Sequence, residues 1–198
     1  NFRKPAGFIG KLIVAGMNSG HTRMAEWGFS HLDGKILGSA LDIGCGGGAN
    51  VKRLLERGCE EVTGIDYSDV CVAQSTKCNK AYIERGTCRI LQASVSSMPF
   101  ENDSFDIATA FETVYFWPEI ETAFKEVFRV LKKGAHFFIC NEVDGLHKGD
   151  EKWPKRISGM KIYTGEQLSA LLTSAGFTGI QTDSLFAKRY LCVTARKG

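Results

Sequence analysis

The stretch that decides the fold of this chain is Leu41-Asp42-Ile43-Gly44-Cys45-Gly46-Gly47-Gly48-Ala49-Asn50. An apolar run ends there at a cluster of glycines, and a helical pattern with Val51, Leu54 and Leu55 on one face follows. Glycine lets the backbone turn sharply and approach a ligand closely, because no Cβ intervenes. The first turn of the helix also presents unpaired N–H groups. The stretch is therefore typical of a strand–loop–helix unit that binds a nucleotide-like ligand.

Composition and charge are those of an ordinary globular domain. Of the 198 residues, 43% are hydrophobic and 24% are charged, which predicts one domain with a full core. The 25 basic and 22 acidic side chains give a net charge of +3, too small by itself to indicate nucleic acid or an acidic membrane as partner. No run of 18 apolar residues and no signal peptide is visible, so we expect no membrane span. The chain begins at Asn1, so a removed leader remains an alternative.

The cysteines and histidines are scattered along the chain. Seven cysteines without a C-x-x-C pair argue against a zinc cluster or a disulfide framework, and they predict a reducing cytoplasm. His31, His136 and His147 do not cluster in the sequence either, so we expect no metal site.

Strand and helix signals alternate from residue 36 onward. This alternation requires a mostly parallel sheet covered on both faces by helices, which is a three-layer α/β sandwich. Only Leu185-Phe186 separates the last two apolar runs, which is too short for a crossover helix, so this pair is predicted to be an antiparallel hairpin. The seven expected strands are 37–43, 61–66, 87–92, 105–111, 135–143, 177–184 and 187–196, and the helices are 49–57, 69–84, 119–132 and 165–175.

We interpret residues 1–198 as a single domain with an N-terminal helical arm at 1–35 and a core at 36–198. The arm has a short amphipathic pattern within residues 1–20 and a second helical pattern from His21 to Leu32. It could close over a ligand as a lid, or it could simply pack on the sheet. A long polar connection at 144–163 is of the kind that is usually functional or mobile.

Acidic residues near the glycine cluster narrow the choice of ligand. Asp42 lies two residues before Gly44, where a carboxylate would repel a pyrophosphate and suit a cation. Asp66 ends the next strand, a position from which a carboxylate can accept both hydroxyls of a ribose. The loop that begins at Ala93-Ser94-Val95 is expected at the same edge of the sheet. These features together predict a pocket for a cationic nucleoside.

On these motifs the chain resembles the class I S-adenosylmethionine-dependent methyltransferases over about residues 36–196. The resemblance implies their Rossmann-like core, with a mostly parallel seven-stranded sheet and a C-terminal antiparallel hairpin. It also implies S-adenosyl-L-methionine as the cofactor and S-adenosyl-L-homocysteine as the product. The cofactor-binding residues carried over by the match are Asp42, Gly44, Cys45, Gly46, Gly48, Asp66, Tyr67, Ser94, Val95, Phe111 and Glu112.

The resemblance gives these positions separate roles. Asp66 corresponds to the ribose-binding acid and Tyr67 to the neighbour that flanks the adenine, whereas Phe111 and Glu112 correspond to the methionine end. Ser94 stands where the family usually has an aspartate at the adenine edge. A serine hydroxyl can bond the adenine amine, but without charge.

The acceptor side is predicted from the segment 111–117, which follows the fourth strand. Glu112 or Tyr115 could orient or deprotonate the acceptor, and the aromatic residues Phe116 and Trp117 could wall it in or could belong to the core. His21 is a further catalytic candidate if the arm closes as a lid. A general base is needed only if the acceptor loses a proton before or during attack.

The predicted function is methyl transfer to an O, N or C nucleophile, with a small molecule as the acceptor and no membrane partner. RNA methylation is an alternative because the lysines of 144–163 could form a local phosphate-binding patch. A cofactor-binding protein without transfer activity is another, since a pocket does not prove chemistry. A nicotinamide oxidoreductase is opposed by Asp42 and by the closing hairpin. The sequence does not predict the oligomeric state.

Overall fold

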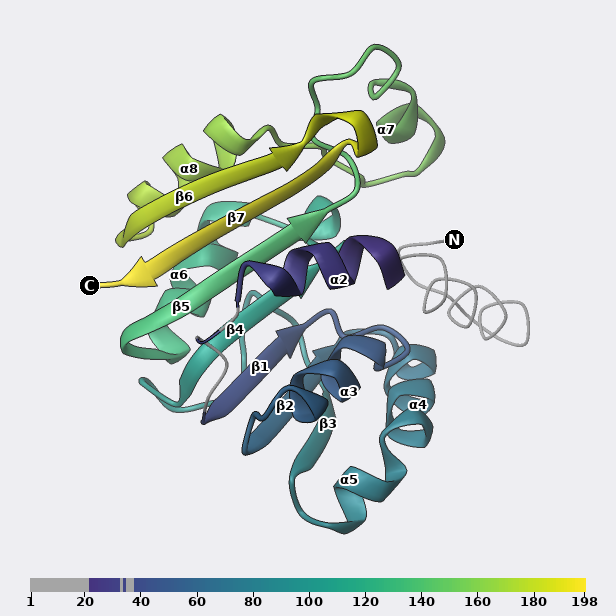
Figure 1. The fold of residues 1–198 in the computed structure, drawn as a ribbon, viewed down its shortest axis with the longest axis vertical. Helices are drawn as coiled ribbons and strands as arrows, with labels where there is room; N and C mark the ends of the chain where they lie inside the picture. The colour runs from purple at the N-terminus through teal and green to yellow at the C-terminus, as the bar shows by residue number, and fades with distance from the viewer. Residues whose placement is uncertain (1–21, 33, 35–37) are drawn as a thin grey trace.

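The computed structural model describes residues 22–32, 34 and 38–198, which form a sheet between two layers of helices (Figure 1). The sheet has seven strands in the order β3-β2-β1-β4-β5-β7-β6. The first five strands pair in parallel, and β7 runs antiparallel to both β5 and β6. The predicted three-layer fold and its closing hairpin are thereby confirmed. The strands are β1 (Ser39–Ile43), β2 (Glu61–Asp66), β3 (Cys88–Gln92), β4 (Phe105–Phe111), β5 (Leu131–Asn141), β6 (Phe177–Leu185) and β7 (Tyr190–Lys197).

Helices cover both faces of the sheet, and none of those in the described part of the chain is long and apolar enough to cross a membrane. Two short 3₁₀ turns also occur, one after β4 and one inside the final hairpin. The helical elements are α2 (Thr22–Ser30), α3 (Ala49–Glu56), α4 (Asp69–Cys78), α5 (Lys80–Glu84), η1 (Val114–Phe116), α6 (Ile120–Val130), α7 (Lys152–Arg156), α8 (Gly165–Ser174) and η2 (Phe186–Lys188).

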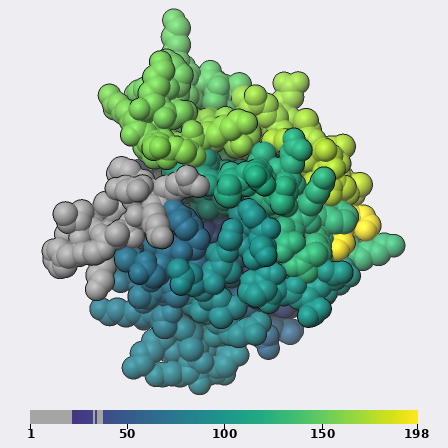
Figure 2. Space-filling view, turned by 180° about the vertical axis from the view of Figure 1, so that it is seen from behind, coloured from purple at the N-terminus to yellow at the C-terminus, as the bar shows by residue number. Residues whose placement is uncertain are grey.

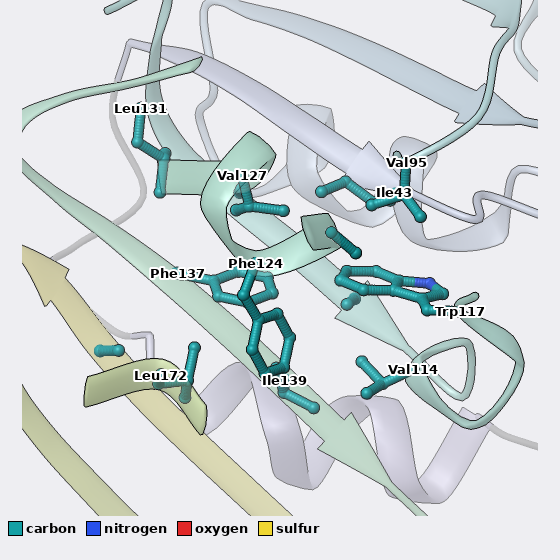
Figure 3. Packing of buried hydrophobic residues seen from close by; sticks show 14 of the residues in the cluster. Ile43, Val95, Val114, Trp117, Phe124, Val127, Leu131, Phe137, Ile139 and Leu172 are labelled. Atoms are coloured by element: carbon teal, nitrogen blue, oxygen red, sulfur yellow. The ribbon is translucent and has the colours of Figure 1, made fainter. Parts of the chain in front are cut away.

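The larger hydrophobic core lies between the sheet and the helices α6 and α8 (Figure 3). Its centre is aromatic: the ring of Trp117 stacks on Phe137 at 6.2 Å between centroids and meets Phe124 edge-on at 5.9 Å. Phe124 comes from the apolar face of α6, whose buried positions follow the spacing that the sequence predicts. Because buried side chains of this size each contribute roughly 1.5–3 kcal/mol, this cluster fixes α6 against the ends of β4 and β5.

A second core on the opposite face contains α2 and α3. Met24 and Phe29 of α2 are at most 1% exposed and pack with Phe138 of β5. Residues 22–30 of the predicted arm therefore pack on the sheet, which is one of the two alternatives given for the arm. The remainder of the predicted arm, including the amphipathic pattern within 1–20, lies outside the described residues.

Three local predictions differ from the structure, and each has a physical reason. The helix expected at 69–84 is broken at Asn79, whose buried side-chain amide donates to the carbonyls of Gly48 and Ser75 at 3.0 Å each. The helix expected at 119–132 ends at Val130, because Leu131 is fully buried and already pairs with Phe105 as the start of β5. The short helix α7 in the polar connection has no apolar periodicity and was not expected.

Candidate functional site

A pocket of about 640 Å³, partly open to solvent, lies at the carboxyl ends of β1 to β4. This edge is where parallel α/β sheets bind ligands. Among the predicted cofactor residues, Gly44, Asp66, Tyr67, Ser94 and Val95 line the pocket. The other lining residues are Ile43, Ile65, Ala93, Thr113, Phe116, Trp117 and Pro118. No lysine or arginine is among these lining residues.

The glycine loop is held against β2 and the segment after β4 by its backbone. The N–H groups of Gly44 and Cys45 both donate to the carbonyl of Ile65, at 2.8 and 2.9 Å. Gly44 has a φ of +75°, and a Cβ placed on it would lie 2.1 Å from the hydroxyl oxygen of Thr113. Only glycine fits this position, which explains how the backbone comes so close to the segment after β4.

Gly46 and Gly48 complete the loop in different ways. Both have positive φ values, +52° and +82°. A Cβ on Gly48 would lie 2.5 Å from the side chains of Ser75 and Asn79, whereas a Cβ on Gly46 would meet nothing within 4 Å. Gly46 is therefore required only for its backbone conformation, and Gly48 is required also for the close approach of α4.

The thiol of Cys45 is buried beneath the loop, with its sulfur 3.7 Å from the hydroxyl of Ser75. Burial raises the pKa of this thiol well above its ordinary value, and the charges of Asp42 and Asp66 raise it further. Since the thiolate is the nucleophilic form, Cys45 is chemically inert here and offers the site its backbone.

Asp66 joins the loop to the end of β2. One carboxylate oxygen accepts from the N–H of Gly46 at 3.0 Å, and the other accepts from the N–H of Ser68 at 2.9 Å. Burial raises the pKa of this carboxyl, and the backbone donors oppose that effect. A carboxylate has about four acceptor positions, so Asp66 can hold the loop and still accept hydroxyl groups from the pocket.

Asp42 lies within β1, beneath the loop, and is only 2% exposed. The hydroxyl of Thr109 on β4 donates to its carboxylate at 2.8 Å, and these two residues are paired in the register of the sheet. Burial raises the pKa of the Asp42 carboxyl to about 7, and the nearby Asp66 adds to the increase. Sequence reasoning missed Thr109, because its partnership depends on which strands are neighbours.

Phe111 departs from the position that the resemblance implies. Its ring packs against Phe29 of α2 at 4.8 Å and against Phe138 at 5.4 Å, within the core on the face of α2 and α3. It does not line the pocket. Residues of a strand alternate between faces, and the side chain of Phe111 falls on the face away from the pocket. A cofactor contact by this side chain stays a prediction, and the packing of its ring in the core does not support it.

Glu112 and Tyr115 brace the ends of β4 and β5 against each other. The hydroxyl of Tyr115 lies 3.1 Å from Oε1 of Glu112 and accepts from the N–H of Val143 at 2.9 Å. The same Glu112 oxygen accepts from the N–H of Glu142 in a short hydrogen bond. Glu112 has a φ of +59°, an unfavourable backbone conformation for a residue with a Cβ and one that clusters at functional sites.

Tyr115 keeps its proton in this arrangement. Burial raises the pKa of its hydroxyl well above the ordinary value, and the adjacent Glu112 raises it further. Of the two roles left open by the sequence, this favours orienting over deprotonating. The third catalytic candidate, His21, lies outside the described residues.

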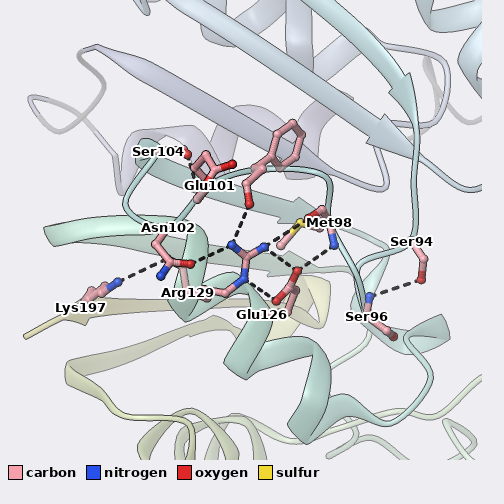
Figure 4. A network of polar contacts seen from close by, with 10 residues as sticks. Ser94, Ser96, Met98, Glu101, Asn102, Ser104, Glu126, Arg129 and Lys197 are labelled. Atoms are coloured by element: carbon pink, nitrogen blue, oxygen red, sulfur yellow. Dashed lines mark hydrogen bonds and ion pairs between the residues drawn. The ribbon is translucent and has the colours of Figure 1, made fainter.

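The segment from Ser94 to Asn102, which begins with the residues at the adenine position of the resemblance, is fastened to α6 (Figure 4). The guanidinium of Arg129 donates to the carbonyls of Phe100 and Met98, at 2.7 and 3.2 Å, and forms an ion pair with Glu126. Glu126 in turn accepts from the N–H of Met98 at 2.8 Å. The hydroxyl of Ser94 accepts from the N–H of Ser96 at 3.3 Å, so it keeps its own proton to donate.

Two polar residues near the strand ends were not found by sequence reasoning. Thr113 lines the pocket and accepts from the indole N–H of Trp117 at 3.1 Å. Asn141 ends β5 and is fully buried, with no hydrogen-bond partner among the described residues for either atom of its amide group. Thr113 lies within the predicted segment 111–117 but was not itself singled out, and Asn141 belongs to no motif, so the sequence offered no signal for it.

Comparison with known proteins identifies the family. A family model described as "Methyltransferase domain" matches residues 41–139, which is half of the chain and includes the glycine loop, Asp66 and the segment after β4. The chain belongs to this methyltransferase-domain family.

Individual relatives agree with this assignment. The chain is 31% identical over 137 residues to the 24-methylenesterol C-methyltransferase 3 of Arabidopsis thaliana, covering 68% of this chain and 38% of that protein. It is 28% identical over 141 residues to an O-methyltransferase of Pyrenophora dematioidea, covering 69% and 53%. The match thus spans about half or less of these curated relatives. A methyltransferase of Haloferax volcanii, solved with the Trm112 activator, shares the fold with a TM-score of 0.80 at 18% identity, over 92% of this chain and 93% of that one.

The cofactor of this methyltransferase family is S-adenosylmethionine, and the pocket fits it. Ile65, Val95 and Trp117 give the pocket apolar walls for an adenine, while Asp66 offers carboxylate oxygens for a ribose. The carboxylates of Asp66 in the lining and of Asp42 in β1 suit a sulfonium cation better than a pyrophosphate. The chemistry of the lining therefore agrees with the methyl donor.

Proposed function

We propose that this chain transfers the methyl group of S-adenosylmethionine to an O, N or C nucleophile of a small molecule. The observation that carries the proposal is the pocket itself, in which Gly44, Asp66 and Ser94 from three different strand ends line a single cavity, with no basic residue among its described lining residues. Family membership supplies the reaction class. The names of the relatives, which are sterol C-methyltransferases and an O-methyltransferase, support a small molecule as the acceptor.

We propose a role in the pocket for every predicted cofactor residue except Phe111, whose side chain lies in the core. Asp66 accepts the ribose hydroxyls, Tyr67 and Val95 flank the adenine, and Ser94 bonds the adenine edge. The backbone of Gly44 to Gly48 receives the amino-acid end, and the charge of Asp42 beneath the loop favours the cationic groups there. Glu112 contributes through its backbone position at the end of β4.

The bound cofactor supplies an electrophilic methyl group that is displaced from sulfur in line with the incoming nucleophile. The residues of the chain contribute by holding the two reactants close and aligned, which is worth up to roughly 7–11 kcal/mol in favourable cases. Trp117 and Phe116 exclude water from the cavity that they line. Tyr115 keeps its proton and positions the β4 and β5 ends through Glu112 and Val143. Carbon and neutral amine acceptors need no base before attack.

Calorimetric titration tests the cofactor part of the proposal. We expect S-adenosylmethionine and S-adenosylhomocysteine to bind with one site per chain, and NADH not to bind. Binding of NADH without either sulfur compound would refute the proposal. Transfer is tested with S-adenosylmethionine that carries a labelled methyl group, offered with sterols, phenols or amines as separate acceptor classes.

RNA methylation and cofactor binding without transfer, the two alternatives, would give different results in the labelled-methyl assay. Incorporation into cell extract that is lost after ribonuclease treatment would indicate RNA as the acceptor. Tight cofactor binding without transfer to any acceptor class or extract would indicate a binding protein. We expect ribonuclease-resistant incorporation into the low-molecular-weight fraction.

We further propose that the chain works in a reducing compartment such as the cytoplasm. All seven cysteines are free thiols, and all but Cys78 are buried, which supports the compartment.

A further inference from the structure

The connection between β5 and α7 carries a cluster of two carboxylates and one imidazole away from the pocket. Asp144, His147 and Asp150 each offer a ligand atom, and these atoms all lie within 4.8 Å of one another. The two aspartates are 1% and 4% exposed, so this is not a solvated acidic surface. The connection forms a lobe at the upper end of the molecule, beside the turn of the β6–β7 hairpin (Figures 1 and 2).

Asp144 is incompletely bonded for a buried carboxylate. Its Oδ1 atom accepts from the N–H of Leu146 at 3.0 Å and lies 2.9 Å from Nδ1 of His147. Its Oδ2 atom is buried and has no hydrogen-bond partner in the part of the chain that the structure describes. Burying a carboxylate oxygen without a donor is strongly unfavourable, so a buried oxygen of this kind points to a cation that completes its surroundings.

The groups that face the cluster from other elements compensate only part of its charge. Arg189, at the end of the η2 turn, places Nη1 3.3 Å from Oδ1 of Asp150. The ring of Phe186 stacks on the imidazole of His147 with 4.2 Å between centroids. One guanidinium therefore faces two carboxylates, and the one that it does not reach is Asp144. The stacked ring also limits the rotation of His147.

We propose that Asp144, His147 and Asp150 bind one divalent first-row transition-metal ion, of which Mn²⁺ is the test case. Mixed carboxylate and imidazole donors suit this class, whereas Mg²⁺ and Ca²⁺ prefer oxygen alone. With metal–ligand bonds of about 2.1 Å, two opposite ligands lie about 4.2 Å apart, so ligand atoms up to 4.8 Å apart need to approach by only about half an ångström.

The bound ion restrains the connection next to Val143, where the connection is hydrogen-bonded to Tyr115 of the candidate active site. Val143, the residue before Asp144, donates its N–H to the Tyr115 hydroxyl, and Lys161 at the far end of the connection donates its N–H to the Tyr115 carbonyl at 2.8 Å. Both ends of the connection are thus hydrogen-bonded to Tyr115. Metal binding by Asp144, His147 and Asp150 therefore holds together the part of the connection that follows the first of these ends. The sequence prediction of no metal site considered the spacing of cysteines and histidines, and it did not consider carboxylates near His147.

The test uses the full chain without an affinity tag, stripped with EDTA and titrated with MnCl₂ by calorimetry and by electron paramagnetic resonance of free Mn²⁺. Mn²⁺ is the probe because it binds thiols weakly, so that the exposed Cys78 does not interfere. We expect one site per chain, with an affinity at least tenfold lower in His147→Ala and in Asp150→Asn. Hydrogen exchange of the amides in 144–151 should slow when Mn²⁺ is added to the wild type.

His31→Gln is the matched control. His31 also bonds a carboxylate, with Nε2 2.8 Å from Asp183, but no second acid among the described residues completes that pair as a metal site. We expect this variant to bind Mn²⁺ as the wild type does. Thermal unfolding without metal establishes that His147→Ala, whose side chain is already partly exposed, remains folded. No saturable Mn²⁺ binding by the wild type, or wild-type affinity in His147→Ala, would overturn the proposal.

Discussion

Replacing Asp42 with asparagine should stabilise the cofactor-free protein at neutral and alkaline pH while weakening cofactor binding. The carboxyl of Asp42 is 2% exposed, and burial raises its pKa from 3.8 to about 7. Asparagine has nearly the same shape, carries no charge, and can still accept the hydrogen bond from Thr109. The variant therefore removes the cost of ionising a buried acid without opening a cavity.

The gain in free energy of unfolding from Asp42→Asn depends on pH, and the raised pKa of Asp42 sets the direction of that dependence. A group whose pKa is raised on folding binds its proton more tightly in the folded state, so the wild type loses stability as pH rises from about 4 to about 7 and then levels off. At 1.36 kcal/mol per pKa unit, that pH-dependent loss is roughly 1.5 kcal/mol at pH 5 and roughly 4 kcal/mol at pH 8. The advantage of Asp42→Asn over the wild type should thus grow by roughly 2–3 kcal/mol between these two pH values.

Urea unfolding of both proteins at pH 5 and pH 8, without cofactor, measures this difference while titrating groups that do not interact with Asp42 cancel. Calorimetry with S-adenosylmethionine then measures the affinity of both proteins for the cofactor. The affinity of the wild type should rise as pH increases through about 7, because the ionised Asp42 favours a cationic ligand. The variant should bind more weakly at pH 8 and without this pH dependence. A stability difference that is equal at both pH values, or equal affinity of the two proteins at pH 8, would refute the reasoning.

Three further predictions concern residues around Asp42. Asp66→Ala should weaken cofactor binding by about 1.5–3 kcal/mol through loss of charge-assisted hydrogen bonds, and unchanged affinity in calorimetry would mean that the ribose lies elsewhere. Gly44→Ala should be destabilised more than the matched Gly46→Ala, by about 1–3 kcal/mol in urea unfolding, since only the former Cβ meets another side chain. Tyr115→Phe should lose about 1–3 kcal/mol of stability but keep the pH profile of kcat/KM; loss of one limb of that profile would instead identify a general base.

The sequence predicted the sheet well because its signals are local. Alternating apolar runs and helical faces gave all seven strands, and the two residues between the last runs were enough to require a hairpin. The errors lie where a tertiary contact decides a local question. Leu131 begins a strand after a helical pattern because Phe105 pairs with it, and Asn79 interrupts a helix because its amide bonds Gly48. Neither contact can be read from the residues that surround the break.

The same distinction separates the two halves of the candidate site. The cofactor half was predictable because Gly44, Gly46 and Asp66 belong to one strand–loop–helix–strand unit, and the N–H of Gly46 bonds Asp66 only 20 residues away. The half that follows β4 depends on contacts between distant segments. Tyr115 meets Val143 across 28 residues, and its carbonyl accepts from the N–H of Lys161, which lies further along the same connection.

The acceptor half and the cofactor half of the site are held by different hydrogen bonds. The connection between β5 and α8 contacts the segment after β4 through Tyr115 and Glu112, whereas the glycine loop bonds only β2 and α4 among the hydrogen bonds given above. Substitutions within 144–163 can move the β4 and β5 ends without breaking a hydrogen bond of the loop, but Thr113, which packs against Gly44, and Trp117 also line the pocket. Variation confined to this connection should therefore alter KM for the acceptor and the affinity for S-adenosylmethionine together, and a change in KM alone would show that the two halves are mechanically independent.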